Sequence, residues 1–241
     1  MSATIQNNQP ITNNPLPRTK KYNLFAHLTN EEMEELDLPH NFINAKKGDY
    51  IYFESSYLNN LYFIKEGFIK IGHINNNGNE IIKEIIQKGE VFGQFTLEQS
   101  NLNGEFARVH KSDVSICAFT IENFKSVLNK NNQLAVAYSK QVSNKLRKVE
   151  NRLLNMLNSD VKTRLLRFFK ELVHSNSDCT DGNSFCMDNF LTHDDIARLI
   201  GSSRQTVTVA INELEAKKYF KISRRLIEIN DIKAIEKAAI I

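Results

Sequence analysis

Hydrophobic and polar residues follow three different patterns along the chain. Residues 1–21 are polar, hold three of the four prolines and show no periodicity, which predicts a disordered leader. Between residues 42 and 119, short runs rich in Ile, Tyr and Phe alternate with turn residues, as in the strands of an all-β unit. From about residue 121 to beyond residue 159, apolar positions recur at helical spacing. This order predicts an α+β protein.

Glycine positions indicate how the β unit turns. Asn77 and Gly78 separate two apolar runs, and this pair tolerates the positive φ angles that a tight hairpin requires. Gly67, Gly78 and Gly89 recur at intervals of eleven residues, which predicts antiparallel strands coiled into a jelly-roll-like β-roll. Before the roll, a Thr and a Glu at capping-box spacing predict a short helix over residues 29–36.

An apolar seam runs along the predicted helix at residues 132–158. Its positions alternate in steps of three and four, the heptad spacing of a coiled coil. In that frame Lys145 takes a g position and Glu150 the next e position, as expected for an ion pair across a parallel dimer. The alternative is a helix that faces its own core, because the seam spans just under three heptads. The predicted dimer interface comprises Val142, Lys145, Leu146, Val149, Glu150, Leu153 and Met156.

Residues 191–216 read LTHDDIARLIGSSRQTVTVAINELEA and predict two helices joined by a sharp turn. Thr192 and Asp195 have capping-box spacing for the first helix. Gly201 falls where the chain must bend, and Ser203 can cap the second helix. These features are typical of a helix-turn-helix motif, whose second helix enters the DNA major groove. The expected inner face of that helix comprises Val207, Ile211 and Leu214.

The outer side chains of the second helix suit base reading, since Arg can pair with guanine, Gln with adenine, and Thr can offer a hydroxyl or a methyl group. Downstream, residues 219–222 and 226–229 predict two short strands around a basic tip, the wing of a winged helix-turn-helix. The arginines of the tip are expected to contact phosphate. The alternative is an ordinary helical hairpin with a polar surface. The predicted DNA-binding residues are Thr192, Ser203, Arg204, Gln205, Thr208, Arg224 and Arg225.

Composition narrows the function without deciding it. The 241 residues carry a net charge of +3, too little to indicate nucleic-acid binding. Residues 140–170 hold nine basic and two acidic residues, which suits either a phosphate backbone or a solvated helix face. The cysteines form no CxxC pair, so we expect neither disulfides nor bound metal. No run of residues is apolar enough to span a membrane, and we expect a cytoplasmic protein. No HExxH, GxSxG or phosphate-binding glycine loop is present, and no catalytic residue is predicted.

The chain resembles the Crp/Fnr family of bacterial transcription regulators from about residue 24 to its C-terminus. The resemblance is strongest in LTHDDIARLIGSSRQTVTVAINELE and extends to GEVFGQ at residues 89–94. It implies a homodimer on a pseudo-palindromic promoter site, RNA polymerase as a further partner, and a small-molecule pocket in the β-roll under the dimer helix. We therefore predict a leader at 1–21, a β-roll effector-type domain at 22–131, a dimerisation helix at 132–158 and a DNA-binding domain at 159–241.

The chain departs from the family where family members bind cyclic AMP. The phosphate-gripping Arg and Ser or Thr are replaced by Glu105 and Phe106. A carboxylate there would repel a cyclic phosphate, and Arg108 would substitute only through a three-residue shift that reverses its side of the strand. We therefore expect a degenerate pocket without cyclic AMP, and no cofactor. The alternatives are a regulator gated by a cyclic nucleotide and a module whose winged domain binds protein. The predicted pocket residues are Gly93, Gln94, Glu105, Phe106, Val149 and Glu150.

Two further departures concern DNA and metal cofactors. Where the family commonly has a Glu followed four residues later by an Arg, this chain has Gln205 and Val209, so we expect a half-site other than the common one. The leader lacks the cysteines that hold an iron–sulfur cluster in oxygen-sensing members. His73 and His110 are isolated, so no haem ligand is predicted.

Overall fold

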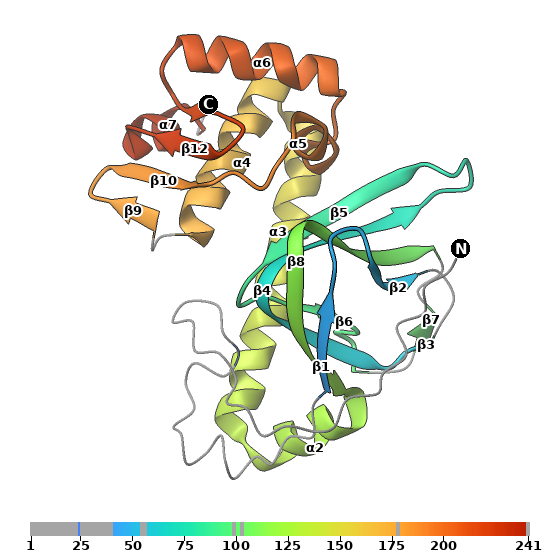
Figure 1. The fold of residues 1–241 in the computed structure, drawn as a ribbon. Helices are drawn as coiled ribbons and strands as arrows, with labels where there is room; N and C mark the ends of the chain where they lie inside the picture. The colour runs from blue at the N-terminus through green and yellow to red at the C-terminus, as the bar shows by residue number, and fades with distance from the viewer. Residues whose placement is uncertain are drawn as a thin grey trace. The chain divides into compact units, whose positions relative to one another are not determined.

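A computed structural model shows the chain folded into two compact units, residues 1–146 and 147–241 (Figure 1). The structure describes Leu24 and residues 41–53, 57–97, 100–101, 104–176 and 179–239. The predicted leader and the predicted helix over residues 29–36 lie outside these residues. No helix in the described part of the chain is long and apolar enough to cross a membrane.

The first unit is built on an antiparallel sheet. Its strands are β1 (Asn41–Ala45), β2 (Tyr50–Phe53), β3 (Tyr57–Leu58), β4 (Asn60–Ile74), β5 (Glu80–Gln87), β6 (Val91–Gly93), β7 (Ser100–Asn101) and β8 (Glu105–Thr120). Strand β8 pairs with β1, β2 and β4, while β5 and β6 also pair with β4, and β3 pairs with β7. Every pairing is antiparallel, so the fold class predicted for this region is confirmed.

Helices follow the sheet. They are α2 (Ile121–Lys130) and α3 (Asn132–Asn158), and α3 crosses from the first unit into the second. Asn131 separates them: its backbone has an extended φ of −129°, and its side-chain oxygen accepts a hydrogen bond from the backbone N–H of Leu134 at 2.9 Å. An asparagine with this geometry caps the helix that follows, so the helical run divides here.

Two hydrophobic clusters lie on opposite faces of β4 and β8. Inside the roll, the rings of Tyr62 and Phe92 stack with centroids 4.9 Å apart, and Tyr52 stacks on both. On the other face, Phe63 and Cys117 pack with residues of α2 and α3. Successive strand residues point to opposite faces, which separates Tyr62 from Phe63. Burial raises the pKa of the Cys117 thiol to about 12, so this cysteine stays protonated and unreactive at neutral pH.

The predicted hairpin joins β4 and β5. The Asn75 side-chain oxygen accepts hydrogen bonds from the backbone N–H groups of Asn77 at 3.0 Å and Asn79 at 2.9 Å. Gly78 has a φ of +76°, whereas Asn77 keeps a negative φ. The turn therefore uses only the glycine of the Asn-Gly pair for its left-handed residue, and the asparagine upstream holds the loop closed.

The second unit contains a winged helix-turn-helix. Its elements are α4 (Val161–Ser175), β9 (Thr180–Asp181), β10 (Ser184–Asp188), α5 (His193–Ile200), α6 (Arg204–Ala216), β11 (Lys221–Ile222), β12 (Leu226–Ile229) and α7 (Ile232–Ala238). Helix α4 contacts α5, α6 and α7, and the ring centroids of its Phe169 and of Phe220 lie 4.4 Å apart. The strands form an antiparallel sheet in the order β11-β12-β10-β9. The predicted two-helix motif and wing are thus confirmed.

Gly67 lets β4 and β8 approach closely, and substitution should disturb the roll. A Cβ at Gly67 (φ +88°) would lie 2.5 Å from the backbone oxygen of Asp113, whereas Gly48 (φ +94°) has nothing within 4 Å of an added Cβ. We expect Gly48→Ala to lower the free energy of unfolding by about 1–2 kcal/mol through its positive φ. Gly67→Ala should lower it by about 2–5 kcal/mol, because backbone overlap adds to that strain. Urea denaturation measures both, and equal losses would contradict a close approach at Gly67.

Candidate nucleic-acid interface and roll interior

A capping box starts α5, as predicted. The Thr192 hydroxyl accepts a hydrogen bond from the backbone N–H of Asp195 at 3.1 Å and donates to Oδ2 of the Asp195 side chain at 2.7 Å. The same carboxylate accepts from the backbone N–H of Thr192 at 3.0 Å and is almost fully buried. The Thr192 hydroxyl therefore gives its proton to the helix cap, which leaves that proton unavailable to DNA.

The turn between α5 and α6 is held by residues of α3 and α4. Gly201 ends α5 with a left-handed φ of +67°, and a Cβ there would overlap the terminal methyl of Met156. Arg152 donates from Nη2 to the Arg198 carbonyl at 3.1 Å, and Arg164 donates from Nη1 to the Gly201 carbonyl at 3.3 Å. Carbonyls at a helix C-terminus carry negative partial charge, so two guanidinium groups stabilise this end of α5.

Hydroxyl groups at the start of α6 also bond within the unit. Ser203 accepts a hydrogen bond from the backbone N–H of Thr206 at 3.1 Å, which is the predicted N-cap. The Thr208 hydroxyl donates to the Arg204 carbonyl at 2.9 Å and lies 3.0 Å from Nδ1 of His193. His193, which sequence reasoning missed, thus joins α5 to α6. Of the residues predicted to bind DNA, Ser203 and Thr208 use their hydroxyl groups to hold the recognition helix.

The outer face of α6 carries a different set of side chains. Arg204 and Gln205 are exposed, as predicted, and so are Val209 and Asn212. Sequence reasoning did not include Asn212, although its spacing of seven residues from Gln205 places both on one face. Helix α6 packs onto the unit through the buried residues Val207, Ala210, Ile211 and Leu214.

The tip of the wing is fixed by its own backbone contacts. The Ser223 hydroxyl accepts hydrogen bonds from the backbone N–H groups of Arg225 at 3.2 Å and Leu226 at 2.9 Å. Buried Asn189 donates from Nδ2 to the Ser223 carbonyl at 2.8 Å. Arg224 and Arg225 are both exposed on this ordered tip, which places two cations where the sequence predicted phosphate contacts.

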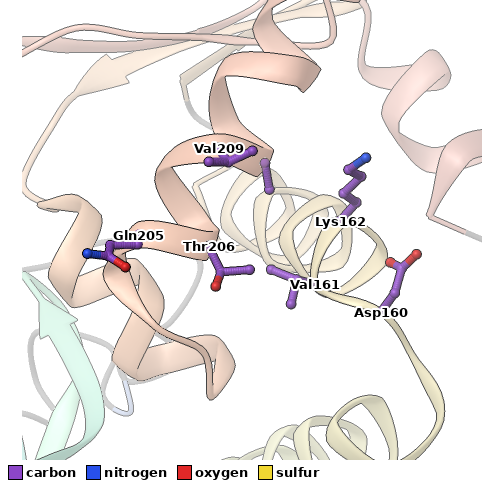
Figure 2. A pocket seen from close by; sticks show the side chains of 7 residues that line it. Asp160, Val161, Lys162, Gln205, Thr206 and Val209 are labelled. Atoms are coloured by element: carbon purple, nitrogen blue, oxygen red, sulfur yellow. The ribbon is translucent and has the colours of Figure 1, made fainter.

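A hollow of about 540 Å³ opens between the first turns of α4 and α6 (Figure 2). Figure 2 shows Thr206 directed toward Val161, whereas Gln205 extends to the other side of α6. The hollow leaves the methyl groups of Val209 uncovered within the unit. The lining residues are Asp160, Val161, Lys162, Gln205, Thr206, Val209 and Ala210.

The two carboxylates of α6 are engaged within the second unit. Glu213 forms an ion pair with Lys162 of α4. Glu215 accepts a hydrogen bond at Oε1 from the backbone N–H of Ile222 at 2.6 Å, which ties α6 to the wing. Glu213 is itself exposed beside Arg204, Gln205, Val209 and Asn212, but its carboxylate is paired with Lys162. The pairing with Lys162 and the bond to the wing therefore reduce the repulsion between these carboxylates and a phosphate.

In the first unit, the predicted pocket residue Glu105 lies at the roll interior and is 9% exposed. Tyr52 donates from its hydroxyl to Oε1 of Glu105 at 2.9 Å, and the Lys83 ammonium pairs with the other carboxylate oxygen. Burial raises the pKa of Tyr52, and the nearby Glu105 carboxylate raises that pKa further, so the phenol remains a donor. A phosphate at this position would face the Glu105 carboxylate and compete with it for Lys83.

Arg108 lies on the other face of β8. It pairs with both side-chain oxygens of Glu80 at 2.8 and 3.0 Å, and its guanidinium lies 5.6 Å from the ring centroids of Tyr50 and Phe106. The residues on either side of Arg108 belong to the interior cluster, so alternation along the strand directs Arg108 away from the interior. Phe106 shares this outward side, and the structure does not bring it together with Glu105 as the predicted pocket required.

Two predicted pocket residues close the edge of the roll near β6. Gly93 has a φ of +102°, and a Cβ there would lie 2.5 Å from the Asn60 carbonyl oxygen. Gln94 is buried and donates from its backbone N–H to the same carbonyl at 3.1 Å. The remaining two predicted pocket residues, Val149 and Glu150, belong to the second unit.

Lys145 contacts the roll. Its Nζ lies 2.5 Å from Oε1 of Glu84 and 4.3 Å from the centroid of the Phe95 ring. A pair with Glu150 of a second copy would therefore require Lys145 to leave Glu84. The apolar positions of the predicted seam are between 36% and 60% exposed, so no described residue covers them fully: Val142, Leu146, Val149, Leu153 and Met156.

Comparison with known proteins covers both units. Residues 42–131 match the family model of the cyclic nucleotide-binding domain, and residues 163–238 match that of the Crp-like helix-turn-helix domain. The Global nitrogen regulator of Nostoc sp. is 27% identical over 182 residues, which cover 75% of this chain and 81% of the relative. The CRP-like cAMP-activated global transcriptional regulator of Mycobacterium tuberculosis is 20% identical over 209 residues, which cover 87% of this chain and 89% of the relative. The structure of FixK2 from Bradyrhizobium japonicum is similar with a TM-score of 0.69 at 16% identity, and the match covers 83% of this chain and 96% of FixK2.

An antiparallel roll of the cyclic nucleotide-binding type, followed by a winged helix-turn-helix, defines a class of DNA-binding transcription regulators. Both parts are present here in that order, and the fold is similar to that of the FixK2 structure. The chain belongs to the Crp/Fnr family.

Proposed function

We propose that the protein is a homodimeric transcription regulator that binds a specific duplex DNA sequence through α6. The exposed face of α6 carries the proposal: it presents guanidinium, amide and methyl groups, while its hydroxyl and carboxylate groups bond within the unit. Guanidinium and amide groups pair with base edges in the major groove, and the arginines of the wing tip suit the adjacent phosphates.

DNA binding should depend on Arg204 and weaken with salt. We expect Arg204→Ala to bind the preferred duplex about 5- to 150-fold more weakly, because one bidentate base contact is lost. Arg224→Ala and Arg225→Ala should each weaken binding to all sequences and lower the salt slope by about one ion. Band-shift titrations at several salt concentrations measure both quantities, on a duplex selected from a random pool.

The control is Lys88→Ala, which removes an exposed cation from the first unit and should leave both quantities unchanged. An Arg204→Ala variant that binds as tightly as the wild type would contradict the role given to α6. No retardation of any duplex at low salt would contradict DNA binding itself and favour a module whose winged domain binds protein.

The apolar seam of α3 supports a dimer. Its residues follow heptad spacing and are exposed in the single chain, so a second copy of the same helix would cover them. Two copies related by a two-fold axis would present two α6 helices to two half-sites about one helical turn of DNA apart. Pairing would also remove an exposed hydrophobic stripe from water.

Neighbouring leucines of α3 provide a matched test of the seam. Leu153 occupies an a position and is 57% exposed, while Leu154 occupies the outward b position and is 55% exposed. We expect the wild type and Leu154→Glu to sediment as dimers at micromolar concentration and Leu153→Glu as a monomer, because it alone places carboxylates in the seam. A monomeric wild type, or the same state for both variants, would contradict the proposed interface.

The roll interior supports a regulator that does not respond to cyclic AMP. The match to the cyclic nucleotide-binding domain favours a nucleotide-gated regulator as the second candidate. Against it stands Glu105, which occupies the interior together with Tyr52 and Lys83. A charged carboxylate and a cyclic phosphate in one buried site repel each other strongly, since the low dielectric constant increases the interaction.

Titration calorimetry distinguishes these two candidates. We expect no saturable heat when cyclic AMP or cyclic GMP is added at micromolar concentrations to the full-length protein, because the phosphate would meet Glu105. Band shifts with and without either nucleotide provide the second readout and should coincide. Micromolar affinity for either nucleotide would contradict the role given to Glu105 and establish the nucleotide-gated alternative.

A further inference from the structure

Three exposed side chains lie along the centre of the outer face of α6. Successive residues of an α-helix are rotated by about 100°, so Gln205, Val209 and Asn212 fall within an arc of about 60°. That arc lies directly opposite the buried residues that attach α6 to the unit. Arg204 lies at one border of the exposed face. The central stripe therefore has the composition amide, methyl, amide, with the guanidinium beside it.

Val209 is the unusual member of this stripe. It is 58% exposed, and outside α3 the described residues of the second unit contain only one other exposed large hydrophobic side chain, Leu226 of the wing. The hollow beside α6 leaves it uncovered. An isolated apolar side chain between two amides does not form the contiguous patch typical of a protein-binding surface. Val209 and the two amides beside it are suited to a partner whose surface is polar overall and offers a single methyl group.

The major-groove edge of an A·T base pair has these properties. Adenine presents an acceptor and a donor that a Gln or Asn amide can pair with simultaneously, and thymine presents the C5 methyl group, which favours apolar contact. A G·C pair offers no methyl group, and cytosine's amino donor is best met by a carboxylate. The two carboxylates of α6 are bound to Lys162 and to the wing instead.

We propose that Gln205, Val209 and Asn212 specify consecutive A·T pairs in each half-site, with Val209 in contact with the C5 methyl group of a thymine. This assignment rests on the proposed binding of DNA through α6. It makes Val209 a specificity-determining residue, and it leaves Arg204 for a guanine at the border of the A·T segment. Removal of the thymine C5 methyl group, or of both γ-methyl groups of Val209, should abolish the same contact.

The test pairs a change in the protein with a change in the DNA. Selection from random duplexes with the full-length protein first identifies the half-site. We expect A·T pairs at the central positions of this half-site, which face Gln205, Val209 and Asn212. Each thymine there is then replaced in turn by deoxyuridine, which lacks only the C5 methyl group. At one position the wild type should bind the deoxyuridine duplex about fourfold more weakly, the factor that one buried methyl group supplies.

The variant Val209→Ala, measured on both the thymine and the deoxyuridine duplex, completes a double-mutant cycle between protein and DNA. It should lose affinity for the thymine duplex and show no further loss on the deoxyuridine duplex, because its methyl partner is already absent. The matched control is Val136→Ala in α3, a valine that is 55% exposed outside the DNA-reading unit, and it should discriminate between the two duplexes as the wild type does. Gln205→Ala should similarly abolish discrimination between adenine and 7-deazaadenine at one position.

The possible outcomes distinguish a failure of the A·T assignment from a failure of DNA binding through α6. Specific, salt-dependent binding to a half-site with G·C pairs at the central positions would overturn the A·T assignment and leave DNA binding intact. Equal affinity of the wild type for thymine and deoxyuridine at every position would overturn the role of Val209 alone. Failure to select any duplex would overturn DNA binding, and the assignment with it.

Discussion

The geometry of the DNA-reading unit depends on how the chain turns at Gly201. The left-handed φ of this residue lets α6 leave α5 at a steep angle, and a side chain there would be strained and would overlap Met156. Arg152 and Arg164 bind the carbonyl groups at the end of α5, so the turn is held from α3 and α4 as well. The hydroxyl groups of Ser203 and Thr208 bond within the motif and Glu213 pairs with Lys162, so the amide, methyl and guanidinium groups of α6 are left to contact a partner.

Charged side chains of the roll pair with one another and with Lys145 of α3. The Glu105 carboxylate is paired with Lys83 and accepts from Tyr52, while Lys145 of α3 pairs with Glu84 of β5. A buried carboxylate without a partner would cost several kcal/mol, so the contacts of Glu105 with Lys83 and Tyr52 stabilise the interior. The ion pair of Lys145 with Glu84 therefore adds to the hydrophobic packing between the roll and α3 within the first unit.

Local features were predictable from the sequence, and long-range contacts were not. The caps at Thr192 and Ser203 involve residues three positions apart, and the buried face of α6 follows from helical periodicity, so both could be inferred directly. Contacts such as those of Lys145 with Glu84 and of Thr208 with His193 join residues on different elements, which only the tertiary structure brings together. Likewise, the sequence marked Val209 as a departure from its family but did not place it at the centre of the exposed face of α6.

The last turns of α3 serve two surfaces at once. Leu153 and Met156 belong to the apolar seam proposed to meet a second copy, and Arg152 and Met156 contact the turn that begins the recognition helix. Met156 is 39% exposed even while it packs against Gly201, so part of its side chain is left for the seam. In the proposed dimer α3 would pack on both sides and would transmit displacement, because close-packed side chains resist compression. Any rearrangement of the seam would therefore shift Met156 and Arg152, and through them the turn that sets the angle of α6.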